Sequence, residues 1–270
     1  MIIALLTDFG LEDGFVAACH GVIGRVAPEV RVLDVTHLVP PGDVRRGAAL
    51  LAQVIRYLPD AVVVGVVDPG VGTDRRAVAV EAGRYVLVGP DNGLLPWAAD
   101  AVGGPDRAWE ITNRRLMLDP VSRTFHGRDV FSPVAAHLAA GIPVAEVGPS
   151  VPVASLARLP DPVCRVGDGW AEAEVLTVDR YGNLQTVLAA DRLAAAGLLA
   201  GAEVGVRSGE VTAPSRYGET FGSAEVGRLV LYEDSAGLAA LAVNGSSAAT
   251  LLRANPGTVI RLTAARRPGG

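Results

Sequence analysis

The sequence predicts an α/β protein: an N-terminal domain with a mostly parallel sheet and helices on both faces, followed by a smaller all-β, barrel-like C-terminal domain. Three observations predict it. Apolar runs alternate with segments of helical spacing in the first half of the 270 residues. Five prolines then fall within residues 141–162, a density typical of a linker. Short β-type segments separated by turn residues follow. The predicted divisions are an N-terminal domain at 1–150, a linker at 151–164 and a C-terminal domain at 165–270.

The N-terminal segments predict the order strand, helix, strand, helix, strand. Apolar strands are expected at Ile2–Thr7, Val30–Val35 and Ala61–Val67, the last too continuously apolar for a half-exposed strand. Helical spacing of apolar residues predicts helices at Glu12–Ala27 and Asp43–Tyr57, the second with a suitable N-cap as its first residue. Right-handed crossovers between such strands give a mostly parallel sheet.

The remaining predicted elements are a hairpin, a closing helix and the C-terminal strands. Ala77–Val80 and Tyr85–Val88 flank a four-residue turn and predict a hairpin at the sheet edge. The alanine-rich segment Asp129–Ala140 predicts the last helix of this half. In the second half, strands are expected at Ala171–Asp179, Glu203–Val206, Arg228–Tyr232, Leu238–Val243 and Thr258–Leu262, and helices at Leu193–Ala202 and Ser246–Ala254.

All 24 basic side chains are arginine, and the sequence contains no lysine. A Schiff base to a carbonyl substrate needs an amine, and a phosphate-binding P-loop and a protein-kinase site each need a lysine. These three classes of site are therefore excluded. The net charge of −5 and the pI of about 5.4 argue against nucleic-acid binding, which usually uses a basic face.

Cysteine usage and hydropathy predict a soluble cytoplasmic protein. Cys19 and Cys164 lie far apart without CxxC spacing, so neither a disulfide framework nor a zinc ribbon is expected. The first residues lack the basic and apolar regions of a signal peptide, and no apolar run reaches the length of a transmembrane helix.

Four polar loops lie next to predicted elements, at positions where α/β proteins place ligands. They are Thr7–Gly10, Val66–Arg76, Gly89–Gly93 and Thr124–Asp129. Ordinary turns use the same residue types, and on position alone that alternative stays open for each loop. The second loop has a carboxylate and two arginines at the end of the most buried strand, which is more polarity than a turn requires. It lacks GxGxxG, so it gives only a weak dinucleotide signal.

Of the four histidines, His126 is the best placed to titrate in a site, because it lies in the loop before a helix. His37 follows a strand, whereas His20 and His137 lie within predicted helices and are expected to be structural. In the second half, Val178–Leu184 combines a carboxylate, an aromatic ring and an amide at a turn, a composition common both at ligand sites and in plain loops.

Seven strings of the sequence together resemble one family, the S-adenosyl-L-methionine (SAM) hydroxide adenosyltransferases. These adenosine-forming SAM hydrolases are relatives of the fluorinase and chlorinase. The strings are TDFG (7–10), DVTH (34–37), VVDPGVGTDRR (66–76), GPDNG (89–93), TFHGRDVFSPVAAHLAAG (124–141), DRYGN (179–183) and SAGLAALAVN (235–244). They span essentially the whole chain in order, and DPGVG together with TFHGRD is specific. The resemblance implies hydrolysis of SAM to adenosine and L-methionine by attack of an activated water at ribose C5′.

By this resemblance, the catalytic aspartate, arginine and histidine of the family fall on Asp68, Arg75 and His126. The halogenating relatives lack the aspartate–arginine pair and carry a hydroxylated loop there. The fluorinase also has an extra loop that this sequence does not contain. Both differences favour water as the nucleophile.

The resemblance also implies where the substrate is held. The ribose-binding aspartate falls on Asp8. Asp179 and Ser235 match positions near the methionine portion, and Asn183 and Asn244 match positions near adenine. Two departures from the family concern the second-domain contacts rather than the chemistry. Val187 stands where the family often has asparagine, and Ala236 stands where the fluorinase has arginine.

The resemblance further implies a homotrimer with each site between neighbouring subunits. SAM is the expected small-molecule substrate, and no cofactor, metal, nucleic acid or membrane partner is expected. Three alternatives stay open at this point: halogenase-type substitution on SAM, a non-catalytic SAM- or adenosine-binding regulator, and a metal-dependent hydrolase with ligands Asp8, His37, Asp68 and His126.

The chemistry of SAM agrees with this choice of residues. Its sulfonium makes C5′ electrophilic, and methionine leaves as a neutral thioether, so the leaving group needs no general acid. The reaction needs a positioned, partly deprotonated water in line with the C5′–S bond. Asp68 can accept a proton from this water or orient it, and His126 can relay a proton near neutral pH. Arg75 stays protonated and can hold Asp68 or the developing hydroxide, although an arginine partner makes a carboxylate a weaker base.

Overall fold

The computed structural model describes residues 1–264, and the chain forms two compact units, Met1–Leu159 and Pro160–Gly270. The division falls within the segment 151–164 that the sequence predicts as a linker. The last six residues of the predicted C-terminal domain, 265–270, lie outside the described residues.

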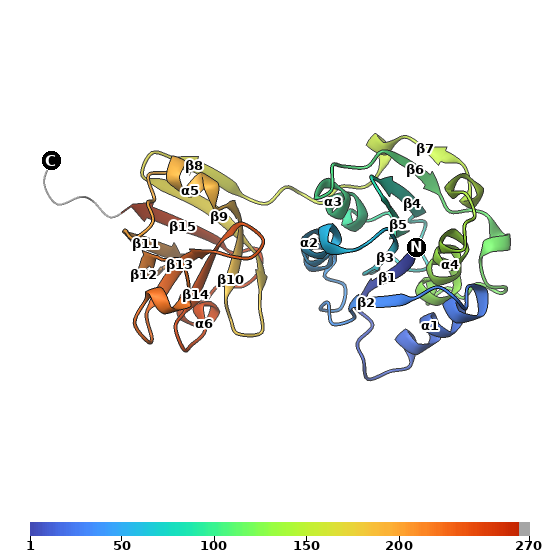
Figure 1. Cartoon of the computed structure of the whole chain (residues 1–270), viewed down its shortest axis with the longest axis horizontal. Coiled ribbons are helices and arrows are strands. Elements are labelled where there is room, and N and C mark those ends of the chain that lie inside the picture. Colours follow the sequence, from blue (N-terminus) through green and yellow to red (C-terminus); the bar gives the residue numbers. More distant parts are fainter. Residues whose placement is uncertain (265–270) are drawn as a thin grey trace, which may run out of the picture. The chain divides into compact units, whose positions relative to one another are not determined.

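Unit 1 contains a seven-stranded sheet in the order β2-β1-β3-β5-β4-β6-β7 (Figure 1). Neighbours in the series β2, β1, β3 and β5 are parallel, and β4, β6 and β7 extend the sheet with antiparallel pairs. The strands are β1 (Ile2–Thr7), β2 (Val32–Thr36), β3 (Ala61–Val66), β4 (Ala77–Ala82), β5 (Tyr85–Pro90), β6 (Arg107–Glu110) and β7 (Ser150–Val151).

Helices cover both faces of this sheet, which confirms the predicted α/β architecture. Successive residues of β1 face opposite sides, as a strand requires: Ala4 packs in the core with α2 and α3, and Ile3 in the core with α1 and α4. The helices are α1 (Phe15–Val26), α2 (Val44–Val54), α3 (Leu94–Asp100) and α4 (Ser132–Ala139), with short helical turns η1 (Ile55–Tyr57), η2 (Arg114–Leu116), η3 (Gly127–Phe131), η4 (Val144–Val147) and η5 (Val153–Ser155).

Three features of unit 1 differ from the predictions. The hairpin β4–β5 is present, but it lies inside the sheet rather than at its edge, because β5 pairs with β3 and β4 pairs with β6. The helix predicted from Asp129 begins at Ser132, after the π-helical turn η3. The short elements α3 and β6 were not predicted, since neither is long enough to show a clear hydrophobic period.

Unit 2 is a barrel of seven strands in the order β10-β14-β13-β12-β11-β15-β9, closed by pairing of β9 with β10. Its interior is filled by one apolar cluster that includes Val175, Leu188 and Leu241. The elements are β8 (Cys164–Gly167), β9 (Trp170–Val178), β10 (Leu184–Ala189), α5 (Asp191–Ala195), β11 (Glu203–Ser208), β12 (Val211–Tyr217), η6 (Phe221–Ser223), β13 (Leu229–Glu233), β14 (Leu238–Val243), α6 (Ala248–Leu252) and β15 (Val259–Ala264). The predicted barrel-like domain is confirmed, whereas β8, β10 and β12 were not predicted.

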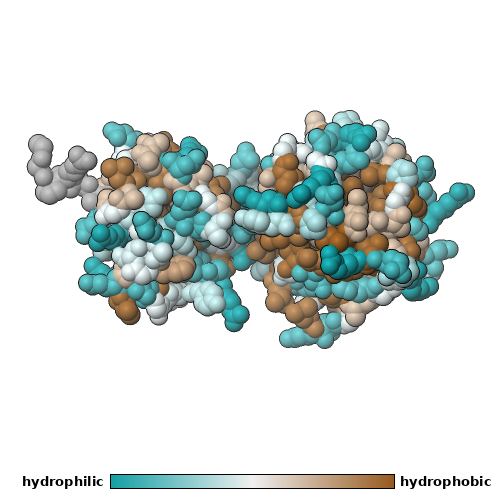
Figure 2. All heavy atoms as spheres, in the orientation of Figure 1, coloured by the Kyte–Doolittle hydropathy of each residue, from teal (hydrophilic) through white to brown (hydrophobic). Residues whose placement is uncertain are grey.

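Figure 2 shows apolar areas among polar ones on the surface of unit 1. The large apolar side chains exposed in this unit include Leu11, Phe15, Leu33 and Leu38. Within residues 1–264, no helix has the length and apolar character needed to cross a membrane.

Candidate active site

The turn that follows β3 places a carboxylate at the carboxyl end of a fully buried strand. Asp68 is the second residue after β3, and its carbonyl accepts the Val71 N–H at 3.2 Å, which closes the Asp-Pro-Gly turn. The Thr73 hydroxyl donates to the Gly70 carbonyl at 2.7 Å and fixes the next part of the loop. Because these bonds are local, the short DPGVGT segment itself sets the backbone conformation of the turn that carries Asp68.

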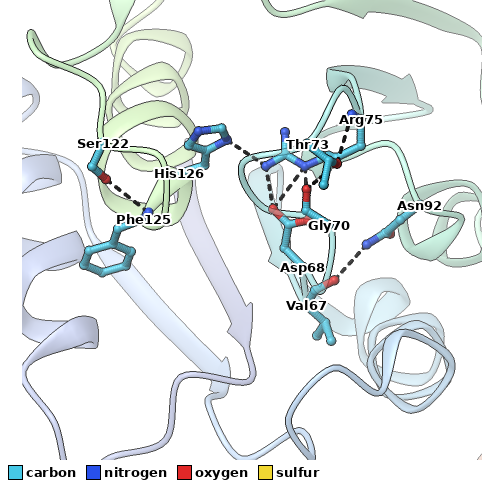
Figure 3. Close-up of polar contacts among 9 residues, drawn as sticks. All are labelled: Val67, Asp68, Gly70, Thr73, Arg75, Asn92, Ser122, Phe125 and His126. Atoms are coloured by element: carbon cyan, nitrogen blue, oxygen red, sulfur yellow. Dashed lines mark hydrogen bonds and ion pairs between the residues drawn. The ribbon is translucent and has the colours of Figure 1, made fainter.

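Asp68 and Arg75 form a buried ion pair (Figure 3). Arg75 Nε donates to Oδ1 and Oδ2 of Asp68 at 3.1 Å each, and Nη2 donates to Oδ2 at 2.5 Å. Only 7% of the Asp68 side chain and 12% of the Arg75 side chain are exposed. The guanidinium also lies over the Phe131 ring, 5.3 Å from its centroid. A pair so well shielded from water interacts more strongly than one on the surface.

Arg75 also joins His126 to this pair. Its Nη2 lies 2.8 Å from His126 Nδ1, so the guanidinium bridges the carboxylate and the imidazole (Figure 3). A guanidinium only donates hydrogen bonds, and Nδ1 must therefore accept this one. In the neutral ring the proton is then on Nε2, which can donate to a ligand. Burial, and next the charge of Arg75, hold the pKa of His126 below its ordinary value of 6.5, which favours this neutral form.

The loop that carries His126 is held by a buried aspartate. Asp129 is fully buried, and its Oδ2 accepts the Ser122 N–H at 2.8 Å. Arg128 Nε donates to Asp129 Oδ1 at 2.6 Å, and the Phe125 N–H donates to Ser122 Oγ at 3.1 Å. Burial alone would raise the pKa of Asp129, but the hydrogen bonds from Arg128 and Ser122 outweigh it and lower the pKa. The sequence placed Asp129 at the end of this loop but could not show its supporting role, which depends on tertiary contacts.

Gly72 allows the DPGVG turn to approach the His126 loop. Its φ is +80°, and a Cβ there would lie 2.6 Å from the Arg123 carbonyl oxygen. We expect Gly72→Ala to lower the free energy of unfolding by about 2 kcal/mol or more, because backbone strain and steric overlap add. It should also lower kcat/KM, because Arg75 and His126 would move apart.

Gly201, with φ +82° and open space at the Cβ position, is the matched control. Gly201→Ala should show only the backbone cost of about 1 kcal/mol and unchanged kcat/KM. Thermal melts and initial rates of both variants measure this. Equal effects of the two changes on both quantities would contradict the close-approach role.

Asp8 lies in the loop directly after β1, as predicted. Its Oδ2 accepts the Gly42 N–H at 2.8 Å, which orients the carboxylate. Among residues 1–264, Oδ1 has no hydrogen-bond partner, so it can accept from a ligand hydroxyl. Next to it, the rings of Phe9, Phe15 and Phe125 pack edge to face, with centroids 5.2 to 6.3 Å apart. The structure therefore combines a carboxylate acceptor with an apolar aromatic cluster in this part of unit 1.

The loop Gly89–Gly93 has structural roles. Asp91 Oδ2 accepts from Arg76 Nε at 2.9 Å, and Asp91 Oδ1 accepts the Ala157 N–H at 2.8 Å. Asn92 Nδ2 donates to the Val67 carbonyl at 2.7 Å, next to Asp68 (Figure 3). This loop thus holds the end of β3 in place, and the turn alternative raised by the sequence fits its contacts.

In unit 2, three of the predicted substrate-binding residues line one pocket of about 570 Å³. Asp179 organises its own turn: Oδ1 accepts the Tyr181 and Asn183 N–H groups at 2.8 and 2.9 Å, and Oδ2 accepts from Asn183 Nδ2 at 2.7 Å. Asn244 Nδ2 donates to the Ala224 carbonyl at 2.8 Å. Its side-chain carbonyl and the second N–H of Nδ2 are therefore the parts of this amide that are left for a ligand.

The sequence pointed to the turn that carries Tyr181 but missed Phe221, and Ser235 lies outside this pocket. Tyr181 and Phe221 line the pocket, and both are exposed, at 73% and 49%. In the sequence, a phenylalanine within a glycine-rich loop was the signal that could have identified Phe221. Ser235 does not line the pocket; it lies in the turn between β13 and β14, whereas Asn244 follows the other end of β14.

Within the described part of the chain, the four residues considered as ligands of a metal-dependent hydrolase do not form one group. Among residues 1–264, the only set of three or more His, Cys, Asp or Glu side chains with mutually close ligand atoms is His20, Asp34 and His37. Asp68 and His126 instead share Arg75 as their partner. A cation between Asp68 and His126 would have to displace the guanidinium.

Family models and known proteins agree on one family. The model of the SAM hydroxide adenosyltransferase N-terminal domain matches residues 3–148, and that of the C-terminal domain matches residues 173–261. The chain is 56% identical to an (R)-S-adenosyl-L-methionine hydrolase from Salinispora arenicola, with 97% of each chain covered. It is 29% identical to a fluorinase from Actinopolyspora mzabensis, again over 97% of each. A crystal structure of an uncharacterised conserved protein from Thermotoga maritima superposes with a TM-score of 0.92 at 34% identity, covering 97% of this chain and 100% of that one.

Proposed function

Because the chain belongs to the SAM hydroxide adenosyltransferase family, we propose that it hydrolyses SAM to adenosine and L-methionine, with Asp68, Arg75 and His126 holding the attacking water. The observation that carries this proposal is the bridged cluster in which one guanidinium contacts both a buried carboxylate and an imidazole. Such a cluster presents hydrogen-bond acceptors and donors at one place without a metal ion.

The reaction balances with water alone. The water oxygen forms a bond to C5′ while the C5′–S bond breaks, and the electron pair of that bond goes to sulfur. The cationic sulfonium becomes the neutral thioether of methionine, and one proton leaves the water. Charge is neutralised at the reacting centre, so a site shielded from bulk water favours the step.

Asp68 is the group that takes or directs the water proton. Arg75 cannot accept a proton, and the Nδ1 lone pair of His126 is already used by Arg75. Each carboxylate oxygen has two lone-pair sites, and within residues 1–264 Asp68 Oδ1 accepts only from Arg75 Nε, at 3.1 Å. Asp68 Oδ1 therefore keeps capacity for the water. His126 donates from Nε2 to the water oxygen, and Arg75 stabilises the developing hydroxide.

The substrate contacts proposed here follow the family resemblance. Asp8 Oδ1 accepts from the ribose hydroxyls, and the unit 2 pocket with Asn183 and Asn244 holds adenine, with exposed aromatic rings available for stacking. Asp179 and Ser235 bind the methionine portion.

We also propose a homotrimer in which each site lies between neighbouring subunits. The exposed apolar side chains of unit 1, among them Leu11 and Leu38, support an interface, because large exposed apolar residues are typical of contact surfaces. Light scattering should give the mass of three chains, and the mass of one chain would contradict the trimer. The cytoplasm is the proposed location, which cell fractionation tests.

Product analysis distinguishes the proposed reaction from its alternatives. Three carbons are bonded to the sulfonium of SAM, and attack of water at each gives different products. Attack at C5′ gives adenosine and methionine in equal amounts, whereas attack at the methionine carbon gives methylthioadenosine, and attack at the methyl carbon gives S-adenosylhomocysteine. Addition of fluoride or chloride should yield no halogenated nucleoside. Unchanged SAM would support a binding protein without turnover and would contradict the proposal.

The pH dependence of turnover should show the lowered pKa of His126. Below this pKa the ring carries a proton on Nδ1, which can no longer accept from Arg75 and repels its charge. We therefore expect kcat/KM to be constant near neutral pH and to fall on the acid side with an apparent pKa below 6.5. In His126→Gln, which cannot titrate, this acid limb should disappear. An unchanged limb in the variant, or a wild-type midpoint above 6.5, would contradict the role given to neutral His126.

A further inference from the structure

Two histidines of unit 1 converge on one carboxylate oxygen, outside the Asp68–Arg75–His126 cluster. His20 comes from α1, Asp34 from β2, and His37 directly follows β2 (Figure 1). The Nε2 atoms of His20 and His37 lie 2.9 and 3.0 Å from Asp34 Oδ1. The three ligand atoms of this group lie within 4.8 Å of one another. The sequence alone marked His20 as structural because it lies within a predicted helix, and it could not show the contact with Asp34, 14 residues away.

His37 has a buried nitrogen that the protein does not satisfy. The side chain is only 3% exposed. Nε2 is close to Asp34, but within the described residues it makes no hydrogen bond of acceptable geometry. Buried polar atoms are almost always paired, so a ring nitrogen that lies 3.0 Å from a carboxylate oxygen without a hydrogen bond to it requires an explanation. A cation held between the two groups provides one.

The other ring nitrogen of His37 is oriented as it is in metal-binding histidines. Nδ1 lies 2.8 Å from Thr7 Oγ1, which also accepts the Phe9 N–H at 3.2 Å. When Nδ1–H donates to Thr7, Nε2 carries a lone pair, which can bind a cation placed beside Asp34. Ligating histidines commonly donate their second N–H in this way, which fixes the tautomer and the ring orientation.

The donor set and its spacing indicate the kind of ion. With metal–ligand distances of about 2.0 to 2.1 Å, two ligands lie about 2.9 Å apart at a right angle and about 3.3 Å apart at a tetrahedral angle. The separations of 2.9 and 3.0 Å therefore need little adjustment. Two imidazoles and one carboxylate suit zinc and related transition metals, whereas magnesium and calcium prefer all-oxygen sites.

We propose that His20, Asp34 and His37 form a binding site for one divalent transition-metal cation of the zinc class per chain, completed by water on the exposed side of His20 and Asp34. The site joins α1 to β2. Through Thr7 and through the Gly10 N–H, which donates to the His37 carbonyl at 2.8 Å, it also holds the loop that carries Asp8. The ion acts as a structural clamp on this loop and not as the activator of the attacking water, and the site does not depend on the proposed hydrolysis.

The test is metal binding by the untagged full-length protein after treatment with a chelator. Titration with Zn²⁺ by calorimetry should show one site per chain, and Co²⁺ should give the visible absorption of a nitrogen- and oxygen-ligated ion. Zn²⁺ should raise the melting temperature. His20→Ala and Asp34→Asn should weaken Zn²⁺ affinity by about tenfold or more, the range found when groups of a metal site are removed. The control His137→Ala removes a histidine outside the group and should leave affinity unchanged.

The choice of variants keeps the outcome interpretable. His20 and Asp34 are partly exposed, with 37% and 41% of their side chains accessible, so their replacement should leave the fold intact, and circular dichroism checks this. Absence of saturable Zn²⁺ and Co²⁺ binding would overturn the proposal. Equal Zn²⁺ affinity of wild-type protein and His20→Ala would overturn it as well, whatever the turnover of either protein with SAM.

Discussion

We expect Asp68→Ala to lower kcat for SAM hydrolysis by about 10²-fold or more, which is the range for a positioned proton acceptor. Asp68 is the only titratable group of the cluster with lone pairs left for water, because the Nδ1 of His126 accepts from Arg75. Adenosine affinity should change little, since the proposed adenine and ribose contacts lie on other residues. Single-turnover rates measure the first effect, and calorimetric titration with adenosine measures the second.

The matched control for this variant is Asp74→Ala in the same loop. Asp74 is exposed and carries the same charge, so its removal tests whether loss of a negative charge near the site is enough to slow the reaction. We expect wild-type kcat from Asp74→Ala. Comparable losses in the two variants, or near-wild-type kcat in Asp68→Ala, would contradict the assignment of Asp68.

The second large effect is expected from Arg75→Lys. Lysine keeps the charge but is a single ammonium, and it cannot reproduce the fork that contacts Asp68 through Nε and Nη2 and His126 through Nη2. Kcat should fall by about 10²-fold, as for loss of a donor that stabilises a developing oxyanion. Because the wild-type sequence contains no lysine, this ammonium would be the only lysine side chain in the protein.

Melting temperatures of two Arg75 variants distinguish this loss of kcat from a loss caused by unfolding. Arg75→Ala leaves Asp68 as a buried carboxylate without its partner, which typically costs about 3–5 kcal/mol, whereas Arg75→Lys retains a cation there and should cost less. Arg75→Lys is thus expected to melt closer to wild type than Arg75→Ala while losing most of its kcat. The opposite order of melting temperatures, or full activity of Arg75→Lys, would rule out the bridging role. The control Arg56→Lys changes an exposed arginine and should affect neither quantity.

The fold could be predicted from local patterns wherever the pattern was long. The run Ile2–Thr7 became β1 without a change of boundary, and Ala61–Val67 differs from β3 by one residue, because fully buried strands leave an uninterrupted apolar signal. The position of the β4–β5 hairpin could not be predicted. Its place inside the sheet depends on pairing with β6. This strand has only four residues, which is too short for its alternation of apolar and polar residues to be recognised in the sequence.

The sequence could identify the residues of the candidate site but not the contacts between their side chains. The loops with Asp68, Arg75 and His126 were found from their composition and from the family resemblance, and the structure brings the three side chains together. The sequence could not show that Arg75 bonds both partners at once, because the pairing spans 51 residues between Arg75 and His126. For the same reason it missed the supporting role of Asp129, as well as the convergence of His20 and His37 on Asp34.

The absence of lysine has a clear mechanistic consequence in the structure. Every cation near the cluster is an arginine, and arginine stays charged, so it positions groups without exchanging protons. His126 is held neutral with its acceptor nitrogen occupied. We therefore propose that the proton of the attacking water passes to Asp68 and then to solvent.

The most direct test of the central claim is hydrolysis of SAM in water enriched in ¹⁸O, with mass spectrometry of both products. Attack of water at C5′ predicts one ¹⁸O atom in adenosine, at the 5′ oxygen, and none in methionine. The same label should be nearly absent from single-turnover samples of Asp68→Ala taken at times when the wild-type reaction is complete. Adenosine without the label, or methylthioadenosine with labelled homoserine, would contradict the claim that a water held by Asp68, Arg75 and His126 attacks C5′.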